Sequence, residues 1–579
     1  MFYLVSQLLG MAKIHHLSIT HFRGIKRFEQ TFSSDFVCLI GRGDSGKSTI
    51  LDAIASVLSS TWNIPFYDND FHECDLEKPI VIEATLRDLP PELIAEEKYG
   101  GYLRTLNLSM NTVSDDVDGG DEAVLTIRLE VRRDLEPIWT VFTNREIGSK
   151  PIGAGDRAKL NAFLVSDYVD RHFSWNKGSP LYSLYMQHAK PDEDDTAMID
   201  ALREAKKKID DTPFARFNEV VNKVTANAAT YGVTISKTGN TIDFKELVIK
   251  DGKLSMHDQD IPFRLKGKGS RRLISMAIQT AIADAGGIIL IDEVEQGLEP
   301  DRVQNLVNRL KGEHKGQVFI TTHSRDVLVE LSHENLFLIR KDQAHLTVFD
   351  KTMRGVLRAN PEAFFARKVL VVEGQTEEGI CRALNHYRQS NGDERAALLG
   401  VKLAIGRGDT CFEYAARFAK AGFPTALLCD SDEKPKEKKA EKKAALRAAD
   451  ILVVDWEKGD SVELAIAKHL PFDGIAQLIK LATDIKVEEN DSLTPDEAKN
   501  RIWEAVGAKY GKACPPFENI KDNKAIREAI GNAAKTGGWF KSISWGLRLG
   551  GLIFSHLDSM AKDNILRKQF LALSTWIDK

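Results

Sequence analysis

Residues 41–48 constrain the fold of this chain most strongly, because they read Gly-Arg-Gly-Asp-Ser-Gly-Lys-Ser and fit the phosphate-binding pattern G-x-x-x-x-G-K-[ST]. The apolar run 36–40 before them predicts a buried strand, and residues 48–59 after them place apolar side chains at helical spacing. A strand, a glycine turn and a helix in this order surround phosphate oxygens with backbone N–H groups and a helix N-terminus. This context favours a phosphate site in an α/β fold over a chance match in a glycine turn.

The side chains of this loop predict how ATP is held. Lys47 is expected to neutralise the β- and γ-phosphates, and Ser48 is expected to ligate Mg²⁺. The residues expected to bind the nucleotide here are Gly41, Gly43, Asp44, Ser45, Gly46, Lys47, Ser48 and Thr49.

Two later apolar segments end in residues suited to ATP hydrolysis. Segment 287–291 ends in Asp292, which is expected to hold Mg²⁺ through water, and in Glu293, which is expected to polarise the attacking water. Segment 319–322 ends at His323, which is placed to sense the γ-phosphate. A buried strand with acidic ends is often only structural, so the order of the motifs carries the catalytic interpretation.

A glycine turn precedes the first of these segments. It contains Gly267, Gly269 and Ser270 and is followed by the helical run 273–285. The order of these motifs resembles the ABC-type ATPase heads of the RecF/SMC group, with residues 19–25 similar to their first strand and phosphate-side arginine, and residues 297–301 similar to their D-loop. The resemblance implies that Gly267, Gly269 and Ser270 act as a signature motif that completes the ATP site of a second copy. No clear Q-loop glutamine is found, and residues 68–72 occupy that region.

A second, unrelated set of carboxylates follows at the ends of two further apolar runs. Glu373 ends the run 368–372 with a glycine turn after it, Glu377 lies in the first turn of the next helix, and Asp430 and Asp432 end the run 424–429. In a parallel α/β sheet the carboxyl ends of the strands converge on one edge, so these side chains are expected to meet there and repel one another unless a cation binds. Carboxylate oxygens without His or Cys suit Mg²⁺ or Mn²⁺, which in such sites activate water for phosphodiester cleavage. The alternative is a solvated acidic strand end.

The Glu-Gly turn followed by the Asp-x-Asp pair resembles the Toprim domain. A Toprim domain behind an ABC-type head resembles the overcoming-lysogenization-defect (OLD) nuclease family, which includes the nuclease subunit of Gabija anti-phage systems. The resemblance implies that Glu373, Glu377, Asp430, Asp432 and Glu463 ligate metal, and that Glu373, Asp430, Asp432 and Lys541 are catalytic, with Lys541 at the scissile phosphate. The alternatives are an amphipathic-helix residue for Glu463 and an ordinary surface lysine for Lys541. Ser431 is a weaker candidate for hydrogen bonding in the centre.

These anchors predict the organisation of the 579 residues. The first half of an ABC ATPase is expected at 11–95, an insertion at 96–234, the second half of the ATPase at 235–350, and a Toprim domain with a helical extension at 365–579. The insertion contains an acidic loop at 114–122 and a helical segment at 196–229. That segment is expected to mediate self-association, with a plain helical decoration of the ATPase head as the alternative.

Net charge and composition limit the kinds of partner and compartment that are expected for this chain. A formal net charge of −5 argues against a uniformly basic surface, so contact with double-stranded DNA is expected at a local basic patch. The run 433–443 carries six lysines and is a solvated face, a mobile loop or such a patch. Six cysteines without a C-x-x-C pair favour a reduced cytoplasmic protein without zinc. Residues 1–10 are apolar but too short to span a bilayer, and no membrane contact is expected.

The sequence therefore predicts an ATP-regulated, divalent-metal-dependent DNA endonuclease, as the OLD resemblance implies, acting in bacterial anti-phage defence as a homodimer or tetramer. A helicase-like protein or a retron is the expected kind of partner, with a lone effector also compatible. The alternative function is a RecF/SMC-like DNA-repair ATPase whose Toprim domain only binds DNA. A primase or topoisomerase is disfavoured, because the cysteine pattern lacks a zinc ribbon and no room remains for a breakage-rejoining domain.

Overall fold

The structure is a computed structural model that describes residues 12–116, 121–165, 172–173, 179–182, 184, 200, 204, 207–208, 215–230, 257–283, 287–312, 316–341, 343–432, 438–511 and 514–579. The predictions made for residues 1–10, for part of the acidic loop (117–120), for most of 196–214 and for part of the lysine-rich run (433–437) lie outside the described residues. The chain forms two compact units, Met1–Val37 with Ser48–Thr321, and Cys38–Lys47 with Thr322–Lys579.

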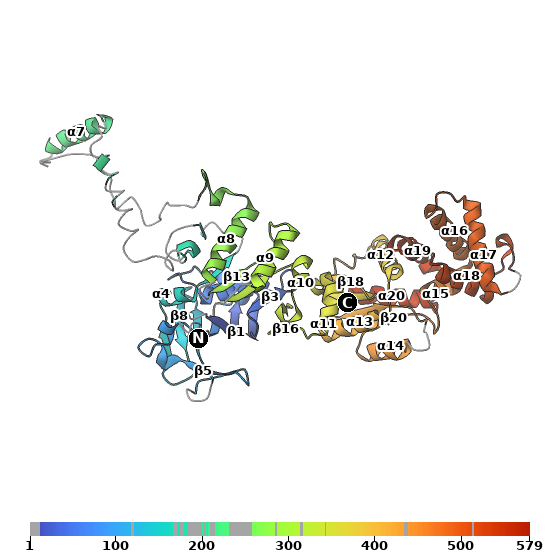
Figure 1. The fold of residues 1–579 in the computed structure, drawn as a ribbon, viewed down its shortest axis with the longest axis horizontal. Coiled ribbons are helices and arrows are strands. Elements are labelled where there is room, and N and C mark those ends of the chain that lie inside the picture. The colour runs from blue at the N-terminus through green and yellow to red at the C-terminus, as the bar shows by residue number, and fades with distance from the viewer. Residues whose placement is uncertain are drawn as a thin grey trace. The chain divides into compact units, whose positions relative to one another are not determined.

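The first unit contains an eight-stranded antiparallel sheet in the order β2-β1-β4-β7-β5-β6, with β8 and β9 continuing from β7 (Figure 1). Along β1 and β4 buried residues largely alternate with less buried ones, as expected where one face of an antiparallel sheet packs on a core. The strands are β1 (Lys13–Phe22), β2 (Ile25–Thr31), β4 (Ile80–Arg87), β5 (Arg104–Asn107), β6 (Thr112–Ser114), β7 (Glu122–Val131), β8 (Pro137–Phe142) and β9 (Ser149–Pro151).

Three parallel strands of the first unit carry the predicted hydrolysis motifs. They are β10 (Ala162–Val165), β13 (Ile288–Ile291) and β14 (Gln317–Thr321), side by side in this order. Every residue of β13 and β14 is buried, which explains their continuous apolar runs. The helices that flank these motifs in the chain are α2 (Lys47–Val57), α8 (Lys268–Ala283) and α9 (Pro300–Gly312), and α7 (Ala215–Thr230) comes from the insertion.

The second unit begins with the end of β3 (Phe36–Ile40), the fully buried strand predicted before the glycine turn. Its last three residues pair in parallel with β15 (Leu336–Leu338), which pairs antiparallel with β16 (Thr347–Val348). Two short helices, α10 (Arg325–Glu330) and α11 (Met353–Ala359), lie before and after these strands in the chain.

The rest of the second unit contains a four-stranded parallel sheet in the order β18-β17-β19-β20 (Figure 1). The strands are β17 (Lys368–Val372), β18 (Val401–Ile405), β19 (Thr425–Leu428) and β20 (Leu452–Val454), and helices α12 (Gln375–Ser390), α13 (Thr410–Lys420), α14 (Lys439–Ala448) and α20 (Ile565–Asp578) pack on them. The strands predicted before Glu373 and Asp430 are thus confirmed, and both carboxylates follow carboxyl ends of neighbouring parallel strands.

A helical extension completes this unit with α15 (Val462–His469), α16 (Phe472–Glu488), α17 (Pro495–Tyr510), α18 (Lys524–Gly537) and α19 (Ile543–His556). Helix α19 packs closely on α12, where a Cβ atom on Gly379 would lie 2.5 Å from the carbonyl carbon of Gly546. This close contact with α19 fixes the position of α12, the helix that carries Glu377. The predicted α/β class is confirmed by the parallel sheets and by the family match reported below. The boundaries of the four predicted segments stay predictions.

Candidate metal centre and nucleotide-binding loop

The phosphate loop, defined here as residues 41–47, has the backbone that its glycines predict. Gly41 and Gly46 have φ angles of 150° and 98°, a region that L side chains rarely adopt. The Lys47 Nζ donates hydrogen bonds to the carbonyl oxygens of Gly41 at 3.0 Å and Arg42 at 2.9 Å. The loop therefore curls around the ammonium that is predicted to meet the phosphates.

The two predicted Mg²⁺ ligands of the first unit lie next to each other. The Ser48 hydroxyl donates to Asp292 Oδ1 at 3.1 Å, and the Thr321 hydroxyl donates to the same oxygen at 2.6 Å. The backbone N–H of Glu293 donates to the Thr321 hydroxyl at 2.7 Å. Thr321 thus orients both carboxylate residues from the neighbouring strand, a role that the sequence analysis missed.

The glycine turn at Gly267 begins α8 and lies close to the loop after the carboxylates. A Cβ atom on Gly269 would collide with the carbonyl oxygen of Gly297, so only glycine allows this approach. From the same helix, Arg272 donates to the carbonyl oxygens of Asp292 and Glu293, the latter at 2.8 Å. Gly267 and Ser270 are exposed, which is compatible with the prediction that this turn meets a second copy.

Two other predicted ATPase residues are placed as follows. His323 is exposed, and its ring centroid lies 6.0 Å from that of Phe365. Arg23 forms ion pairs with Asp52 and, at 2.8 Å, with Asp70. Residues 68–72, which occupy the region where a Q-loop glutamine was sought, form part of the wall of a pocket of about 570 Å³. The pocket is lined by Arg23, Gly24, Pro65, Tyr67, Asn69, Asp70, Phe71, Glu73 and Cys74.

The carboxylate centre, defined here as Glu373, Glu377, Asp430, Asp432 and Glu463, is assembled from the edge of the parallel sheet and two helices. The backbone N–H of Asp430 donates to Glu373 Oε2 at 2.9 Å, which joins the ends of two neighbouring strands. The N–H of Val462 donates to Asp430 Oδ1 at 2.7 Å and so brings the start of α15, with Glu463, to the same place. Glu377 lies in the first turn of α12, as predicted.

The carboxylates of the centre influence one another electrostatically. Burial, together with the charges of Glu373 and Glu463, raises the pKa of Glu377 to about 7. Burial, together with the charges of Glu377, Glu463 and Glu373, raises the pKa of Asp430 well above its ordinary value. Burial alone would also raise the pKa of Asp432, but ion pairs with two lysines outweigh burial and lower it. The centre therefore concentrates negative charge in a buried place.

Three lysines that the sequence analysis did not single out contact the centre. Lys439 lies 3.3 Å from Glu373 Oε1 and 3.2 Å from Asp432 Oδ1, and Lys535 lies 2.5 Å from Asp432 Oδ2. Lys443 donates to the carbonyl oxygen of Asp430 at 2.8 Å and to the Ser431 hydroxyl at 2.9 Å. The predicted Lys541 is exposed, and among the described residues it pairs with none of these carboxylates.

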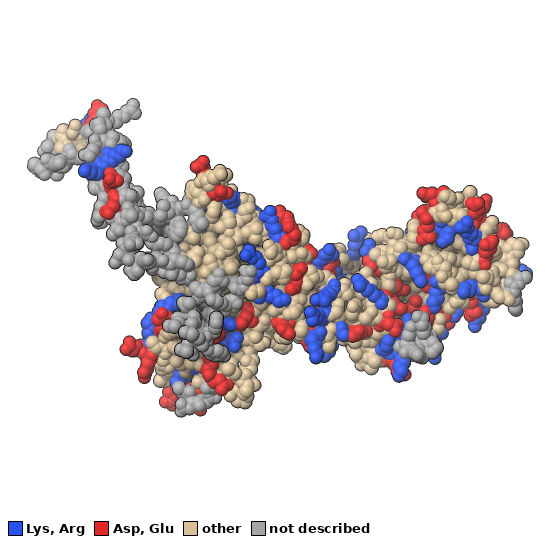
Figure 2. Space-filling view, viewed as in Figure 1, with Lys and Arg blue, Asp and Glu red and all other residues tan. Residues whose placement is uncertain are grey.

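Lys439 and Lys443 belong to the lysine-rich run, and both are only 5 % exposed. The interpretation of that run as a solvated face is therefore wrong for these two residues. They share one buried face of α14 with Leu446, at positions i, i+4 and i+7. On the face of the molecule in Figure 2, Lys and Arg lie interspersed with Asp and Glu, in keeping with the small net charge.

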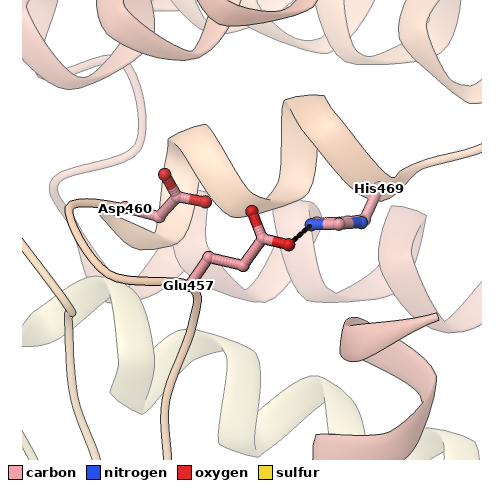
Figure 3. Close-up of side chains that lie close together, drawn as sticks. All are labelled: Glu457, Asp460 and His469. Carbon is pink, nitrogen blue, oxygen red and sulfur yellow. Dashed lines mark ion pairs between the residues drawn. The ribbon is translucent and has the colours of Figure 1, made fainter. Parts of the chain in front are cut away.

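A neighbouring cluster supports the Asp-x-Asp loop. Glu457, Asp460 and His469 offer ligand atoms within 4.8 Å of one another, and the His469 ring faces the Glu457 carboxylate at 3.9 Å (Figure 3). Lys468 already donates to Asp460 Oδ1 at 2.6 Å, so this cluster has its own cation. The carbonyl oxygen of Asp460 accepts from the N–H of Ser431 at 2.8 Å, which ties the cluster to the centre.

Among the described residues, no helix is long and apolar enough to cross a membrane.

Residues 12–139 match the family described as "AAA ATPase domain", and residues 122–330 match "AAA domain, putative AbiEii toxin, Type IV TA system". Residues 364–432 match "Overcoming lysogenization defect protein-like, TOPRIM domain".

The chain is 21% identical over 465 residues to the "Retron Ec83 probable ATPase" of Escherichia coli. The matched region covers 68% of this chain and 84% of that protein. Among solved structures, the SMC head domain from Thermotoga maritima is 14% identical, with 58% of this chain and 99% of that chain covered, at a TM-score of 0.27. The recombination mediator protein RecF is 13% identical, with 59% and 100% covered, at a TM-score of 0.31. The chain combines AAA ATPase domains with an overcoming-lysogenization-defect-like TOPRIM domain, the architecture predicted from its motifs.

Proposed function

We propose that the chain is an ATP-regulated, divalent-metal-dependent DNA endonuclease that hydrolyses phosphodiester bonds at the carboxylate centre. One observation carries the proposal: hydrogen bonds join the end of β17 at Glu373, the end of β19 at Asp430 and the start of α15 beside Glu463, so that buried carboxylates meet at one place. Burial and the neighbouring acidic charges raise the pKa of Glu377 and Asp430 accordingly. Holding buried carboxylates together costs stability that a bound cation restores, and sites with such perturbed carboxylates are typical of catalysis. A domain that only binds DNA has no need for this arrangement.

The donor set fits a hard divalent cation, because all its members are carboxylates and Mg²⁺ or Mn²⁺ prefers such oxygens. The bound ion supplies an activated water and stabilises the leaving oxygen. Lys541 is proposed to contact the scissile phosphate, and Lys535 offers a second ammonium beside Asp432. The proposed metal ligands are Glu373, Glu377, Asp430, Asp432 and Glu463.

The ATPase is proposed to act as a switch. Ser48 and Asp292 hold Mg²⁺, Glu293 activates water and His323 senses the γ-phosphate, while the exposed turn at Gly267 completes the site of a second copy. A homodimer follows from this division of labour. A tetramer follows if α7, whose Val220 and Val224 are 61% and 59% exposed, forms a second interface between copies.

The biological setting is proposed from the relatives together with the predicted chemistry. The name of the Escherichia coli relative favours a retron reverse transcriptase and its RNA as the partner, with a helicase-like protein as the alternative. Either partner places the chain in the bacterial cytoplasm, where double-stranded DNA of an invading phage is the substrate.

The test is cleavage of plasmid and linear duplex DNA by the full chain with Mg²⁺ or Mn²⁺, with and without ATP. We expect metal-dependent cleavage by wild type and none by Glu373→Gln. Glu413→Gln is expected to cleave like wild type, because Glu413 is a half-exposed partner of Arg417 outside the centre. Lys47→Ala is expected to cleave DNA but no longer to respond to ATP. Normal ATP hydrolysis without cleavage under any condition, including added partner, contradicts the proposal. It would favour the DNA-binding ATPase instead.

A further inference from the structure

Lys439 occupies the middle of the carboxylate centre. Its ammonium lies 3.3 Å from Glu373 Oε1, 3.2 Å from Asp432 Oδ1 and 3.7 Å from Asp409 Oδ1. Its side chain is buried, and a charge buried away from water must be paired. The three carboxylates provide that pairing, and Lys439 in turn neutralises part of their charge.

The other lysine of the same helix face is held in a different way. Lys443 donates to a backbone carbonyl oxygen, at Asp430, and to the Ser431 hydroxyl, and it pairs with Asp455 at 3.2 Å. None of these oxygens is a carboxylate oxygen of the carboxylate centre, so Lys443 does not compete with a cation for the proposed ligands. Within the part of the chain that the structure describes, the side chain of Lys439 pairs with carboxylates, and two of them, Glu373 and Asp432, are proposed metal ligands.

The spacing of the carboxylates agrees with a lysine between them. Among the described residues, no three members of the carboxylate centre bring ligand oxygens within 4.8 Å of one another. A cation held by several of them must draw the oxygens closer, and the ammonium between Glu373 and Asp432 lies in the way. A dication and an ammonium competing for the same buried oxygens repel each other strongly.

We propose that Lys439 is a tethered counter-ion that neutralises the metal-free centre and is displaced when a divalent cation binds, so that it sets the metal concentration at which the centre fills. The proposal rests on the nuclease function proposed above. It assigns Lys439 a role that DNA binding by the lysine-rich run would not give it.

The test measures metal binding rather than cleavage. Mn²⁺ is titrated into the full-length protein at pH 8, without nucleotide or DNA, and free Mn²⁺ is followed by electron paramagnetic resonance. Sites lost in Asp430→Asn identify the centre. We expect Lys439→Met to bind Mn²⁺ about tenfold more tightly at that site than wild type, because a competing cation is gone. Lys439→Arg, which keeps the charge, is expected to stay close to wild type.

Lys442→Met is the matched control, because Lys442 is on the same helix but is only partly buried. Its ion pair is with Asp409, at 3.3 Å, and its ammonium lies 5.5 Å from the centroid of the Phe412 ring, so it touches no proposed metal ligand. Its Mn²⁺ affinity is expected to be unchanged, and thermal unfolding verifies that each variant is folded. If Lys439→Met binds Mn²⁺ equally or more weakly while wild type has the Asp430-dependent site, Lys439 is not a competitor and the inference fails alone. If wild type has no Asp430-dependent site, the proposed metal centre fails and the inference with it.

Discussion

Arg42, the second residue of the phosphate loop, donates a hydrogen bond at 3.3 Å to the carbonyl oxygen of Leu398, in the loop that leads into β18. The same guanidinium lies over Gly400, where φ is +79° and a Cβ atom would collide with it. The carbonyl oxygen of Gly400 accepts from the N–H groups of Arg367 and Lys368, at the start of β17. The loop predicted to hold ATP is therefore linked, through Gly400, to the start of the strand that ends at Glu373.

We predict that Arg42→Ala weakens the coupling between nucleotide and nuclease without abolishing either activity. Lys47 and the loop backbone, which are predicted to hold ATP, are unchanged in this variant, so ATP hydrolysis is expected to remain. The ratio of the DNA cleavage rates with and without ATP is expected to move toward one by about threefold or more. The measurement is plasmid cleavage over a series of ATP concentrations. Arg395→Ala, exposed in the same loop, serves as control, and an unchanged ratio in Arg42→Ala would show that coupling runs elsewhere.

Arg272→Ala is predicted to slow ATP hydrolysis by about tenfold or more while ATP still binds. A rate factor of this size corresponds roughly to the free energy of one or two charge-assisted hydrogen bonds. Arg272 donates to the backbone oxygens that position Asp292 and Glu293, and to Gln296 Oε1 at 2.7 Å. The measurement is phosphate release with parallel ATP binding. Arg302→Ala on α9, which removes a surface ion pair with Glu299, is expected to hydrolyse ATP normally. Equal rates for both variants would disprove the positioning role.

The stability of the metal-free protein is predicted to fall with rising pH because of Glu377. The pKa of this carboxyl is raised from 4.5 to about 7 in the folded protein, so the folded state holds the proton more tightly than the unfolded chain does. Stability is lost as pH rises from 4.5 to about 7 and is then constant. Glu377→Gln removes this loss. The free energy of unfolding of the variant minus that of wild type should therefore increase by on the order of 2 kcal/mol between pH 5 and pH 8.

Urea unfolding with chelator at the two pH values measures this difference. Added Mn²⁺ is expected to stabilise wild type at pH 8 more than the Gln variant, because the ionised carboxylate is a proposed ligand. A constant difference between the two proteins from pH 5 to pH 8 would rule out a raised pKa for Glu377.

Two glycines of α19 are predicted to respond oppositely to alanine. A Cβ atom on Gly546 would collide with the carbonyl oxygen of Thr376 on α12, so Gly546→Ala is expected to cost about 1–3 kcal/mol and to disturb Glu377. A Cβ atom on Gly551 meets nothing within 4 Å, so Gly551→Ala is expected to add about 0.5–1 kcal/mol through helix propensity. Urea unfolding of both variants measures this, and similar effects would contradict the packing described for α12 and α19.

Much of the site could be predicted because its residues follow short apolar runs. The runs before Gly41, Asp292, Glu373 and Asp430 became strands β3, β13, β17 and β19, and parallel pairing placed Glu373 beside Asp430. Chain order and strand direction suffice for such a prediction.

The residues that were missed act across the fold instead. Arg272 and Thr321 contact Asp292 from other elements, and Lys535 reaches Asp432 from 103 residues away, contacts that depend on how helices pack. Lys439 and Lys443 did leave a signal, since they share an i, i+4, i+7 pattern with Leu446. Because two of the three positions are lysine, the pattern resembled a solvated run rather than a buried face.

The bonds between Asp460 and Ser431 affect how a random mutant library of this protein would be interpreted. The loop that ends at Asp460 exchanges two backbone hydrogen bonds with Ser431, at 2.8 Å and 3.0 Å, and Asp460 pairs with Lys468. An inactive Asp460 mutant would look like the loss of a metal-binding acid, although the damage would come from a misplaced neighbouring loop. Genetic screens alone would therefore count one catalytic acid too many.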